Sequence, residues 1–285
     1  MPVAAVIIPA HNEASIIEDC LSTMLDGALH GEFDVIVAAN GCTDDTAVIA
    51  RRFPGVRVVD TPIASKVAAL NLADDSTSVW PRIYVDADVR VDVHALRETA
   101  DAITNGGALA AAPQLHVDMG DRPWSVRSFY QIYSQIPWTQ NGMIGSGLYA
   151  LSKDGHQRLG RFPDVIYEDL VVSRLFQPGE RVTVPNATFT IAAPRNLRTL
   201  IAIKTRVATG NLSYRRTPPE GIEQHIPKRD KKTYLRIASR PSQWPALAVY
   251  CTVYALTRAG ARRRYRNGNT KTWTRDHTIR TAPGP

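Results

Sequence analysis

The chain has 285 residues, of which 44% are hydrophobic and 21% are charged. These values are close to the averages of globular proteins and exclude a disordered or fibrous chain, so we expect one large α/β domain or two smaller ones. Cys20, Cys42 and Cys251 are widely separated and lack metal-ligand spacing. Neither a disulfide framework nor a zinc site is expected, and the simplest compartment is a reducing cytosol. The N-terminus has no basic segment of the kind that opens a cleaved signal peptide.

The net charge of +7 is unevenly distributed along the chain. Residues 1–194 carry a net charge of −9, and the chain from Arg195 onward carries +16. This asymmetry indicates an acidic partner for the C-terminal third, either anionic lipid, lipid-linked phosphate or nucleic acid, and we expect nucleic acid least. The alternative is a solvated basic tail that only aids solubility.

The first half of the chain alternates between predicted strands and helices. Residues 4–8 are short, apolar and partly β-branched, which predicts a buried strand that stops at Pro9. The apolar spacing from residue 14 to 25 predicts a helix. Residues 34–39 predict a second strand, followed by a turn at 40–46 in which Thr43 or Asp44 can cap a second helix.

Two further strands, at 56–59 and 83–85, enclose a predicted helix at 66–72. Strands that alternate with helices imply right-handed crossovers and a largely parallel sheet, which binds ligands beyond the carboxyl ends of its strands. The polar loops after Ile8, Ala39 and Val85 all lie at that edge. We therefore expect the functional site there.

The second half of the chain is less regular. We expect an Ala-rich strand near Leu109, an aromatic segment at 124–138 and a strand at 148–151. Residues 244–256 form an apolar run of 13 residues. This is shorter than the roughly 20 residues that span a bilayer, and its basic flanks fit an interfacial helix as well as a buried core helix.

The motif Asp86-Ala87-Asp88 directly follows a predicted buried strand. Two carboxylates that are one residue apart can both face Mn²⁺ or Mg²⁺, and such an ion can bridge diphosphate oxygens. From this motif alone, a solvated turn after a strand explains the residues equally well.

Several motifs together resemble glycosyltransferase family 2, and their order and spacing match that family as well. The resemblance covers roughly residues 3 to 212. The matching motifs are Val-Ile-Ile-Pro-Ala-His-Asn-Glu at 6–13, Asn-Gly-Cys-Thr-Asp-Asp-Thr at 40–46, Lys66 with Ala69-Leu70-Asn71, Asp86-Ala87-Asp88, Gly145-Ser146-Gly147 and Tyr167-Glu168-Asp169-Leu170.

The resemblance implies a GT-A fold of the α/β class, with a Rossmann-like, mostly parallel sheet flanked by helices. The implied catalytic domain spans 1–212, and 213–285 form a helical, basic extension that closes over the site or touches an anionic membrane surface. The implied reaction is an inverting, metal-dependent transfer of a single sugar from a nucleotide-diphosphate sugar to an acceptor hydroxyl. A UDP-sugar is favoured as the donor. The acceptor is a glycan, a lipid-linked molecule or a small molecule. We expect a cytoplasmic protein that can lie at the inner face of the membrane.

The resemblance also implies roles for individual residues. Asp88 and Asp86 would hold Mn²⁺ or Mg²⁺, and Asp169 would deprotonate the acceptor hydroxyl. Glu168, Gly145 and Ser146 would contact the acceptor, although acidic residues at 168–169 also suit a helix N-terminus. The implied donor contacts are Pro9, His11, Glu13, Asn40, Asp44, Lys66, Asp86 and Arg206.

The donor contacts have a chemical rationale. Carboxylates and amides can pair with ribose hydroxyls and base edges, and a lysine ammonium suits phosphate oxygens. Gly41 would permit a backbone conformation that a Cβ would obstruct. His11, His94 and His116 have no ligand spacing between them, so we assign none of them to the metal.

Two departures from the family pattern limit the inference. Ala39 stands where an acidic residue often precedes the turn, which weakens the expectation about base recognition. Lys204-Thr205-Arg206-Val207 stands where processive relatives carry Gln-x-x-Arg-Trp, which favours transfer of one sugar over polymer synthesis.

Three rival functions also need consideration. A haloacid-dehalogenase-like phosphatase would carry Asp-x-Asp-x-Thr, but Val89 and Arg90 follow Asp88 here. A nucleotidyltransferase would carry a glycine-rich loop with Arg and Lys after the first strand, where 9–13 read Pro-Ala-His-Asn-Glu. A non-catalytic sugar-nucleotide-binding or scaffold protein would not need the carboxylates at 86, 88 and 169.

Overall fold

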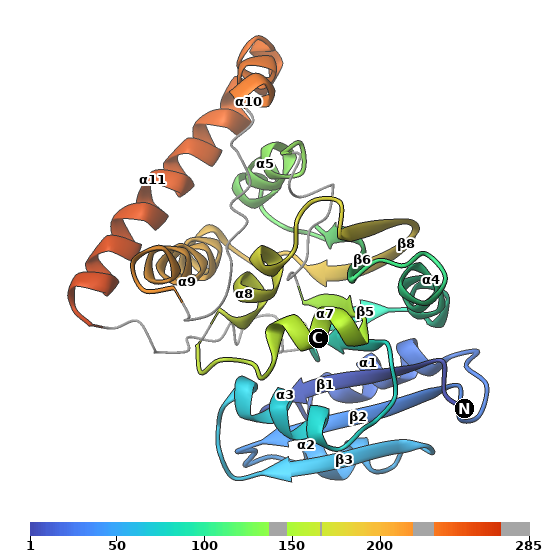
Figure 1. Cartoon of the computed structure of the whole chain (residues 1–285). Coiled ribbons are helices and arrows are strands. Elements are labelled where there is room, and N and C mark those ends of the chain that lie inside the picture. Colours follow the sequence, from blue (N-terminus) through green and yellow to red (C-terminus); the bar gives the residue numbers. More distant parts are fainter. Residues whose placement is uncertain (137–146, 166, 219–230, 269–285) are drawn as a thin grey trace. The chain divides into compact units, whose positions relative to one another are not determined.

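The computed structural model describes residues 1–136, 147–165, 167–218 and 231–268 (Figure 1). Residue contacts group the chain into two compact units, the first formed by Met1–His116 with Gly142–Ile191 and the second by Val117–Asn141 with Ala192–Pro285. The predicted division at residue 212, between a GT-A domain and a C-terminal extension, stays a prediction. Residue 212 itself lies inside helix α9 (Leu197–Arg216).

An eight-stranded sheet runs in the order β3-β2-β1-β4-β7-β6-β8-β5. The pairings β1 with β2, β2 with β3 and β1 with β4 are parallel, and those of β4 with β7, β6 with β7 and β5 with β8 are antiparallel. The parallel pairings together join more residues than the antiparallel ones, so the predicted α/β fold with a mostly parallel sheet is confirmed. The strands are β1 (Ala4–Ala10), β2 (Phe33–Asn40), β3 (Val56–Thr61), β4 (Arg82–Val85), β5 (Val89–Val91), β6 (Ala110–Asp118), β7 (Leu148–Leu151) and β8 (Arg181–Ala192).

Strand β1 lies in the centre of the parallel part of the sheet, and every one of its residues is buried. Val6 pairs with Val35 of β2 on one side and with Ile83 of β4 on the other. A strand that is covered on both faces needs a continuous apolar run, which its sequence supplies. The strand order reverses at β1, and ligands of such sheets bind in the crevice at the carboxyl ends of the strands that flank this point.

The helices of the first unit flank this sheet (Figure 1). Side chains cap three of them, because Ser65, Asp92 and Ser152 accept hydrogen bonds from the amides of Ala68, Ala95 and Gly155. The helices are α1 (Ile17–Leu25), α2 (Thr46–Ala50), α3 (Lys66–Asp75), α4 (Val93–Thr104), α7 (Lys153–Leu159) and α8 (Glu168–Leu175).

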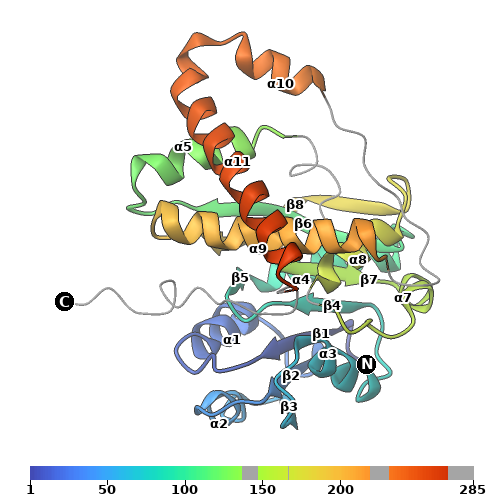
Figure 2. The ribbon, with the colours of Figure 1, turned by 90° about the vertical axis from the view of Figure 1, so that its left-hand side faces the viewer.

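The second unit is mainly helical, and its core includes Phe129, Leu200, Ile237 and Tyr250. Its elements are α5 (Trp124–Tyr133), α9, α10 (Lys231–Ala238), a short 3₁₀ helix η1 (Pro241–Gln243) and α11 (Trp244–Arg266). Helix α11 packs against α9 and α5 (Figure 2). A Cβ on Gly260 of α11 would lie 2.9 Å from Thr205 Cγ2 of α9, so the two helices approach closely there.

The apolar run at 244–256 begins helix α11 and continues into the basic residues up to Arg266. One face of the helix belongs to the core of the second unit, through Ala246, Tyr250 and Val253. The core-helix alternative of the sequence analysis therefore holds for this face, and the opposite face is exposed. None of the helices among the described residues has the length and apolar character needed to cross a bilayer.

Candidate active site

Lys66 forms two ion pairs at the carboxyl edge of the sheet. Its Nζ lies 2.6 Å from Asp86 Oδ1 and 2.6 Å from Glu168 Oε1. Lys66 is the first residue of α3, Asp86 follows β4, and Glu168 is the first residue of α8. One ammonium group therefore joins three elements that are far apart in the sequence.

A small pocket opens beside this ammonium group. Four residues that the sequence predicted for the site, Pro9, Lys66, Asp86 and Asp169, lie in its wall. It is thus located at the ends of β1 and β4, at the edge where the polar loops were expected to converge. The complete lining is Pro9, Lys66, Leu70, Tyr84, Val85, Asp86, Gly147, Tyr149 and Asp169.

The carboxylates of the site interact with each other. Burial, and then the neighbouring Glu168 carboxylate, raise the pKa of Asp169 to about 7, and Lys66 opposes this rise. Burial alone would lower the pKa of Lys66, but Asp86 and Glu168 raise it above its ordinary value. The site therefore combines an ammonium that stays charged with a carboxyl group that titrates near neutral pH, as a general base requires.

Gly147 forms the wall of the pocket next to Asp86. Its φ of +99° belongs to the region that favours glycine, and a Cβ there would lie 2.7 Å from Val89 Cγ2. Its carbonyl accepts a hydrogen bond of 2.7 Å from the amide of Asp86. Gly145 and Ser146, the predicted acceptor contacts of the same motif, lie outside the described residues, and their roles stay predictions.

The turn at 86–88 offers two carboxylates to a cation. Ala87 is buried between them, while Asp88 is exposed and the Asp86 side chain is 34% exposed. Carboxylate oxygens suit Mn²⁺ and Mg²⁺. Within the described ranges no group of three or more His, Cys, Asp and Glu side chains could hold a metal ion. Two carboxylates are too few to complete the coordination of such an ion, so other oxygen atoms would have to fill the remaining positions.

The other predicted donor contacts hold together the loops after β1 and β2. Asn40 Nδ2 donates to the Ala10 carbonyl over 2.9 Å, and the His11 ring donates to the Asn40 carbonyl. Asp44 Oδ2 accepts from the amide of Ala14 over 3.0 Å. Glu13 is buried in the same region. These residues are not among those that line the pocket, and their roles toward a donor stay predictions.

Gly41 and two basic residues of α9 are the remaining residues with a role predicted from the sequence. Gly41 has a φ of +55°, and a Cβ there would lie 2.9 Å from the Ala64 backbone, which confirms the expected need for glycine. Arg206 belongs to α9 in the second unit. Lys204, on the same helix, lies 4.1 Å from the centroid of the Tyr133 ring.

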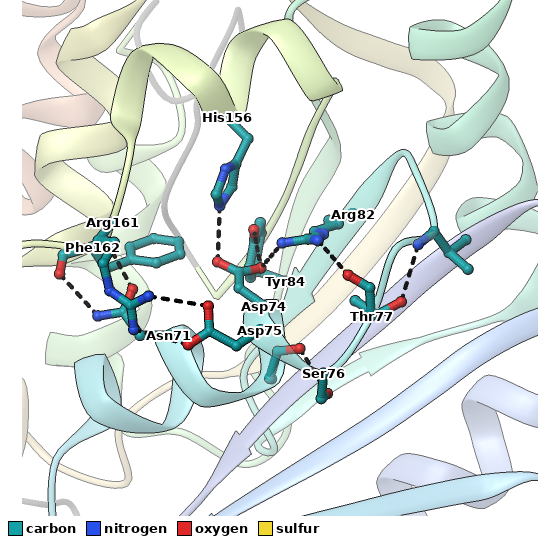
Figure 3. Close-up of polar contacts among 12 residues, drawn as sticks. Asn71, Asp74, Asp75, Ser76, Thr77, Arg82, Tyr84, His156, Arg161 and Phe162 are labelled. Atoms are coloured by element: carbon teal, nitrogen blue, oxygen red, sulfur yellow. Dashed lines mark hydrogen bonds and ion pairs between the residues drawn. The ribbon is translucent and has the colours of Figure 1, made fainter.

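A buried network around Asp74 was missed by the sequence analysis (Figure 3). Asp74 Oδ1 accepts from Arg82 Nη1 over 2.7 Å and from the Tyr84 hydroxyl over 2.9 Å. Asp74 Oδ2 lies 2.8 Å from His156 Nε2. A carboxylate four residues after the buried Leu70 lies on the inner side of a helix, which is a signal that could have revealed the network.

This network fixes the end of α3 that is distant from Lys66. Asp74 ties the helix to β4 and α7, and Asn71 exchanges two hydrogen bonds, of 3.1 and 3.0 Å, with the Phe162 backbone (Figure 3). The ring of Tyr84 stacks on Tyr149 with centroids 5.0 Å apart, and both line the pocket. Helix α3 is therefore held at both ends by the segments that carry the site.

Comparisons with known proteins identify the family of the chain and its fold. The family model described as "Glycosyl transferase family 2" matches residues 5–165, more than half of the chain. The chain therefore belongs to glycosyl transferase family 2. A search of the curated proteins found no match.

Solved structures with a similar fold include two glycosyltransferases. One is the mannosyltransferase PcManGT from Pyrobaculum calidifontis in complex with GDP-Man and Mn²⁺, with 21% identity and a TM-score of 0.59 over 94% of this chain and 83% of that chain. The other is glucosyl-3-phosphoglycerate synthase from Mycobacterium tuberculosis in complex with UDP, with 20% identity and a TM-score of 0.53 over 76% of this chain and 81% of that chain. These similarities show the GT-A fold.

We predict that Asp74→Ala lowers the free energy of unfolding by about 3–5 kcal/mol, because it leaves the buried Arg82 without its carboxylate partner. Asp75→Ala is the matched control, since Asp75 forms an exposed ion pair with Arg161 at 3.0 Å. Urea unfolding measures both variants. Equal effects of the two substitutions would contradict the role given to the Asp74 network.

We also predict that Asp169→Asn stabilises the ligand-free protein more at pH 8 than at pH 5. The pKa of Asp169 in the folded protein, about 7, is higher than in the unfolded chain. The folded protein therefore binds more protons between these two pKa values, and wild-type stability falls as the pH rises through that window. An asparagine cannot titrate, so the variant does not lose stability as the pH rises through this window. A difference in unfolding free energy between variant and wild type that stays constant over this pH range would refute the raised pKa.

Proposed function

We propose that this protein transfers a single sugar, with inversion, from a nucleotide-diphosphate sugar to an acceptor hydroxyl. The chain is a family 2 member, and the observation that carries the proposal is the pairing of Lys66 with Asp86 and Glu168 at a pocket that Lys66, Asp86 and Asp169 line. We place the catalytic part in residues 1–212 and regard 213–285 as a basic extension.

The diphosphate of the donor has a natural partner in Lys66. The ammonium lies in the pocket wall and stays charged because the neighbouring carboxylates raise its pKa. A compact ammonium that binds two carboxylates in the ligand-free protein can exchange one of them for a phosphate oxygen. Asp86 would then be released toward the cation.

The acceptor hydroxyl would lose its proton to Asp169. A carboxyl group with a pKa of about 7 is half ionised at neutral pH, so it can accept a proton and still be available as carboxylate. The Asp169 Oδ1 atom accepts from the amide of Leu170 over 2.7 Å, which fixes the direction of the side chain. Glu168, held by Lys66, orients this first turn of α8 and supports the acceptor.

The residues that would hold the divalent cation are Asp88 and Asp86. When bound, Mn²⁺ or Mg²⁺ neutralises charge on the departing nucleoside diphosphate. The structures of similar fold support this choice, since PcManGT is described with GDP-Man and Mn²⁺ and the synthase with Mn²⁺, UDP-glucose and phosphoglyceric acid. Both UDP- and GDP-sugars are therefore candidate donors, with a UDP-sugar favoured by the sequence motifs.

We predict that Asp169→Asn lowers the turnover number at least about 100-fold, the usual contribution of a general base. The assay measures release of nucleoside diphosphate from UDP- and GDP-sugars with Mn²⁺ and a panel of hydroxyl acceptors, including 3-phosphoglycerate. Asp154→Asn is the matched control, because Asp154 is the second residue of α7 as Asp169 is of α8, and it is exposed. Near-normal transfer by Asp169→Asn would exclude it as the base. Phosphate release from a phosphomonoester without any acceptor would favour the phosphatase alternative.

We further predict that chelation with EDTA abolishes transfer and that added Mn²⁺ restores it. Asp88→Asn should raise the Mn²⁺ concentration needed for half-maximal activity, since the variant removes one of the two carboxylates. A titration of activity against Mn²⁺ measures this shift. An unchanged Mn²⁺ requirement would show that Asp88 does not hold the ion.

A further inference from the structure

Helices α10 and α11 expose large apolar side chains to solvent. Leu235 of α10 is 70% exposed, Trp244 at the start of α11 is 58% exposed, and Leu256 is 49% exposed. The two helices are joined through η1, and the Trp244 Nε1 atom donates to the Ala238 carbonyl over 2.9 Å. The end of α10 and the start of α11 therefore form one fixed corner within the second unit.

The exposed face of α11 combines apolar and basic residues. Its buried stripe, Ala246, Tyr250, Val253, Thr257 and Ala261, repeats every three or four residues and packs into the second unit. The opposite face has the same repeat and carries the exposed residues Trp244, Ala248, Cys251, Ala255, Arg258, Arg262 and Arg266. One straight face is thus apolar in its first half and basic in its second half.

The charge of this region has one sign. Residues 231–268 contain nine Lys and Arg and no Asp or Glu. On α10, exposed Lys232 and Arg236 flank exposed Leu235. A structural core explains the buried stripe of α11, but it does not explain why exposed Trp and Leu side chains occur in a segment, 231–268, that contains no Asp or Glu.

We propose that the exposed face of α10 and α11 binds an anionic membrane surface. Helix α11 would lie flat, with Trp244 and, on the flank of the face, Leu256 at the boundary between headgroups and acyl chains. Arg262 and Arg266 of the face and the flanking Arg263 would lie at the lipid phosphates. Trp side chains favour this boundary because one part of the ring is apolar and the N–H is polar. The proposal is independent of the reaction that the first unit catalyses.

Other partners fit this surface less well. A nucleic acid would pair with the basic half but would leave Trp244, Leu235 and Leu256 in water. A second copy of the chain would bring this basic surface against itself, and like charges repel. An anionic lipid surface offers both an apolar interior and negative phosphates, so it matches both halves of the helix.

Sedimentation of the full chain with vesicles tests the proposal. We expect binding to vesicles rich in phosphatidylglycerol, little binding to phosphatidylcholine vesicles, and release at high salt because exposed charges are screened. The double variant Arg262→Gln/Arg263→Gln should bind about 25-fold more weakly, which corresponds to about 1 kcal/mol for each lost charge. Its matched control is Arg51→Gln/Arg52→Gln, an exposed arginine pair in the first unit.

The apolar half has its own matched pair of variants. Trp244→Ser should weaken vesicle binding, whereas Trp124→Ser, with a side chain that is 63% exposed on α5, should not. Leu256→Ser is a second test, because it removes apolar area and leaves the hydrogen bond of Trp244 intact. Circular dichroism confirms that each variant is folded before binding is compared.

Three results would overturn the proposal. The first is equal vesicle binding by wild type and both double variants. The second is a dimer without vesicles that Trp244→Ser dissociates, because the face would then bind a second copy. The third is tighter binding to RNA than to vesicles, if Arg262→Gln/Arg263→Gln loses the RNA binding and Trp244→Ser keeps it. The partner of this face would then be a nucleic acid. Transfer activity is measured without vesicles and is a separate readout. A failure of the membrane-binding proposal would therefore not contradict the proposed reaction.

Discussion

The candidate site depends on one ammonium group among three carboxylates. Lys66 pairs with Asp86 and Glu168, and the Asp169 carboxyl group lies beside them. Burial raises the pKa of Asp169, and the neighbouring carboxylates raise it further because one positive charge cannot balance three negative ones. A site with excess negative charge attracts a cation, which is the property that a metal-bound diphosphate donor needs.

The fold brings these groups together through a small number of elements. The strand order reverses at β1, so the loop after β1 and the turn after β4 border the same crevice. Helix α3 begins at Lys66 on the edge of this crevice, and its last turn is bonded through Asp74 to Arg82 and Tyr84 of β4 (Figure 3). Because both ends of α3 are fixed, the ammonium of Lys66 is held in place by buried hydrogen bonds on the far side of the helix.

Much of the first unit could be predicted from the sequence. The apolar run at 4–8, the turn at 40–46 and the motif at 86–88 each have a local cause, either periodicity or turn chemistry, and the parallel order follows from the alternation of strands and helices. The pairing of Lys66 with Asp86 and Glu168 could not be predicted, because it depends on how three separate segments fold onto each other. The spacing of Asp74 from Leu70 indicates the inner side of a helix, but the partners of Asp74 could not be predicted for the same reason. His156 is distant in sequence, and nothing in the spacing identifies it as a partner.

The second unit shows a different limit of sequence analysis. The length and composition of residues 244–256 allowed both a core helix and an interfacial helix, and α11 has one face of each kind. Periodicity gives the faces of a helix but not the neighbour that covers one of them. The contacts of α11 with α9 and α5 supply that information and leave the face with Trp244 and the arginines as the exposed one.

The central claim is that the pocket beside Lys66 binds a nucleoside diphosphate together with a divalent cation. A thermal-shift panel of UDP, GDP, dTDP and CDP, each with and without Mn²⁺, tests it most directly, because a ligand that binds only the folded state raises its stability. The account predicts that one nucleotide raises the melting temperature when Mn²⁺ is present and has little effect without it. A shift that does not depend on Mn²⁺, or no shift with any nucleotide, would contradict the account.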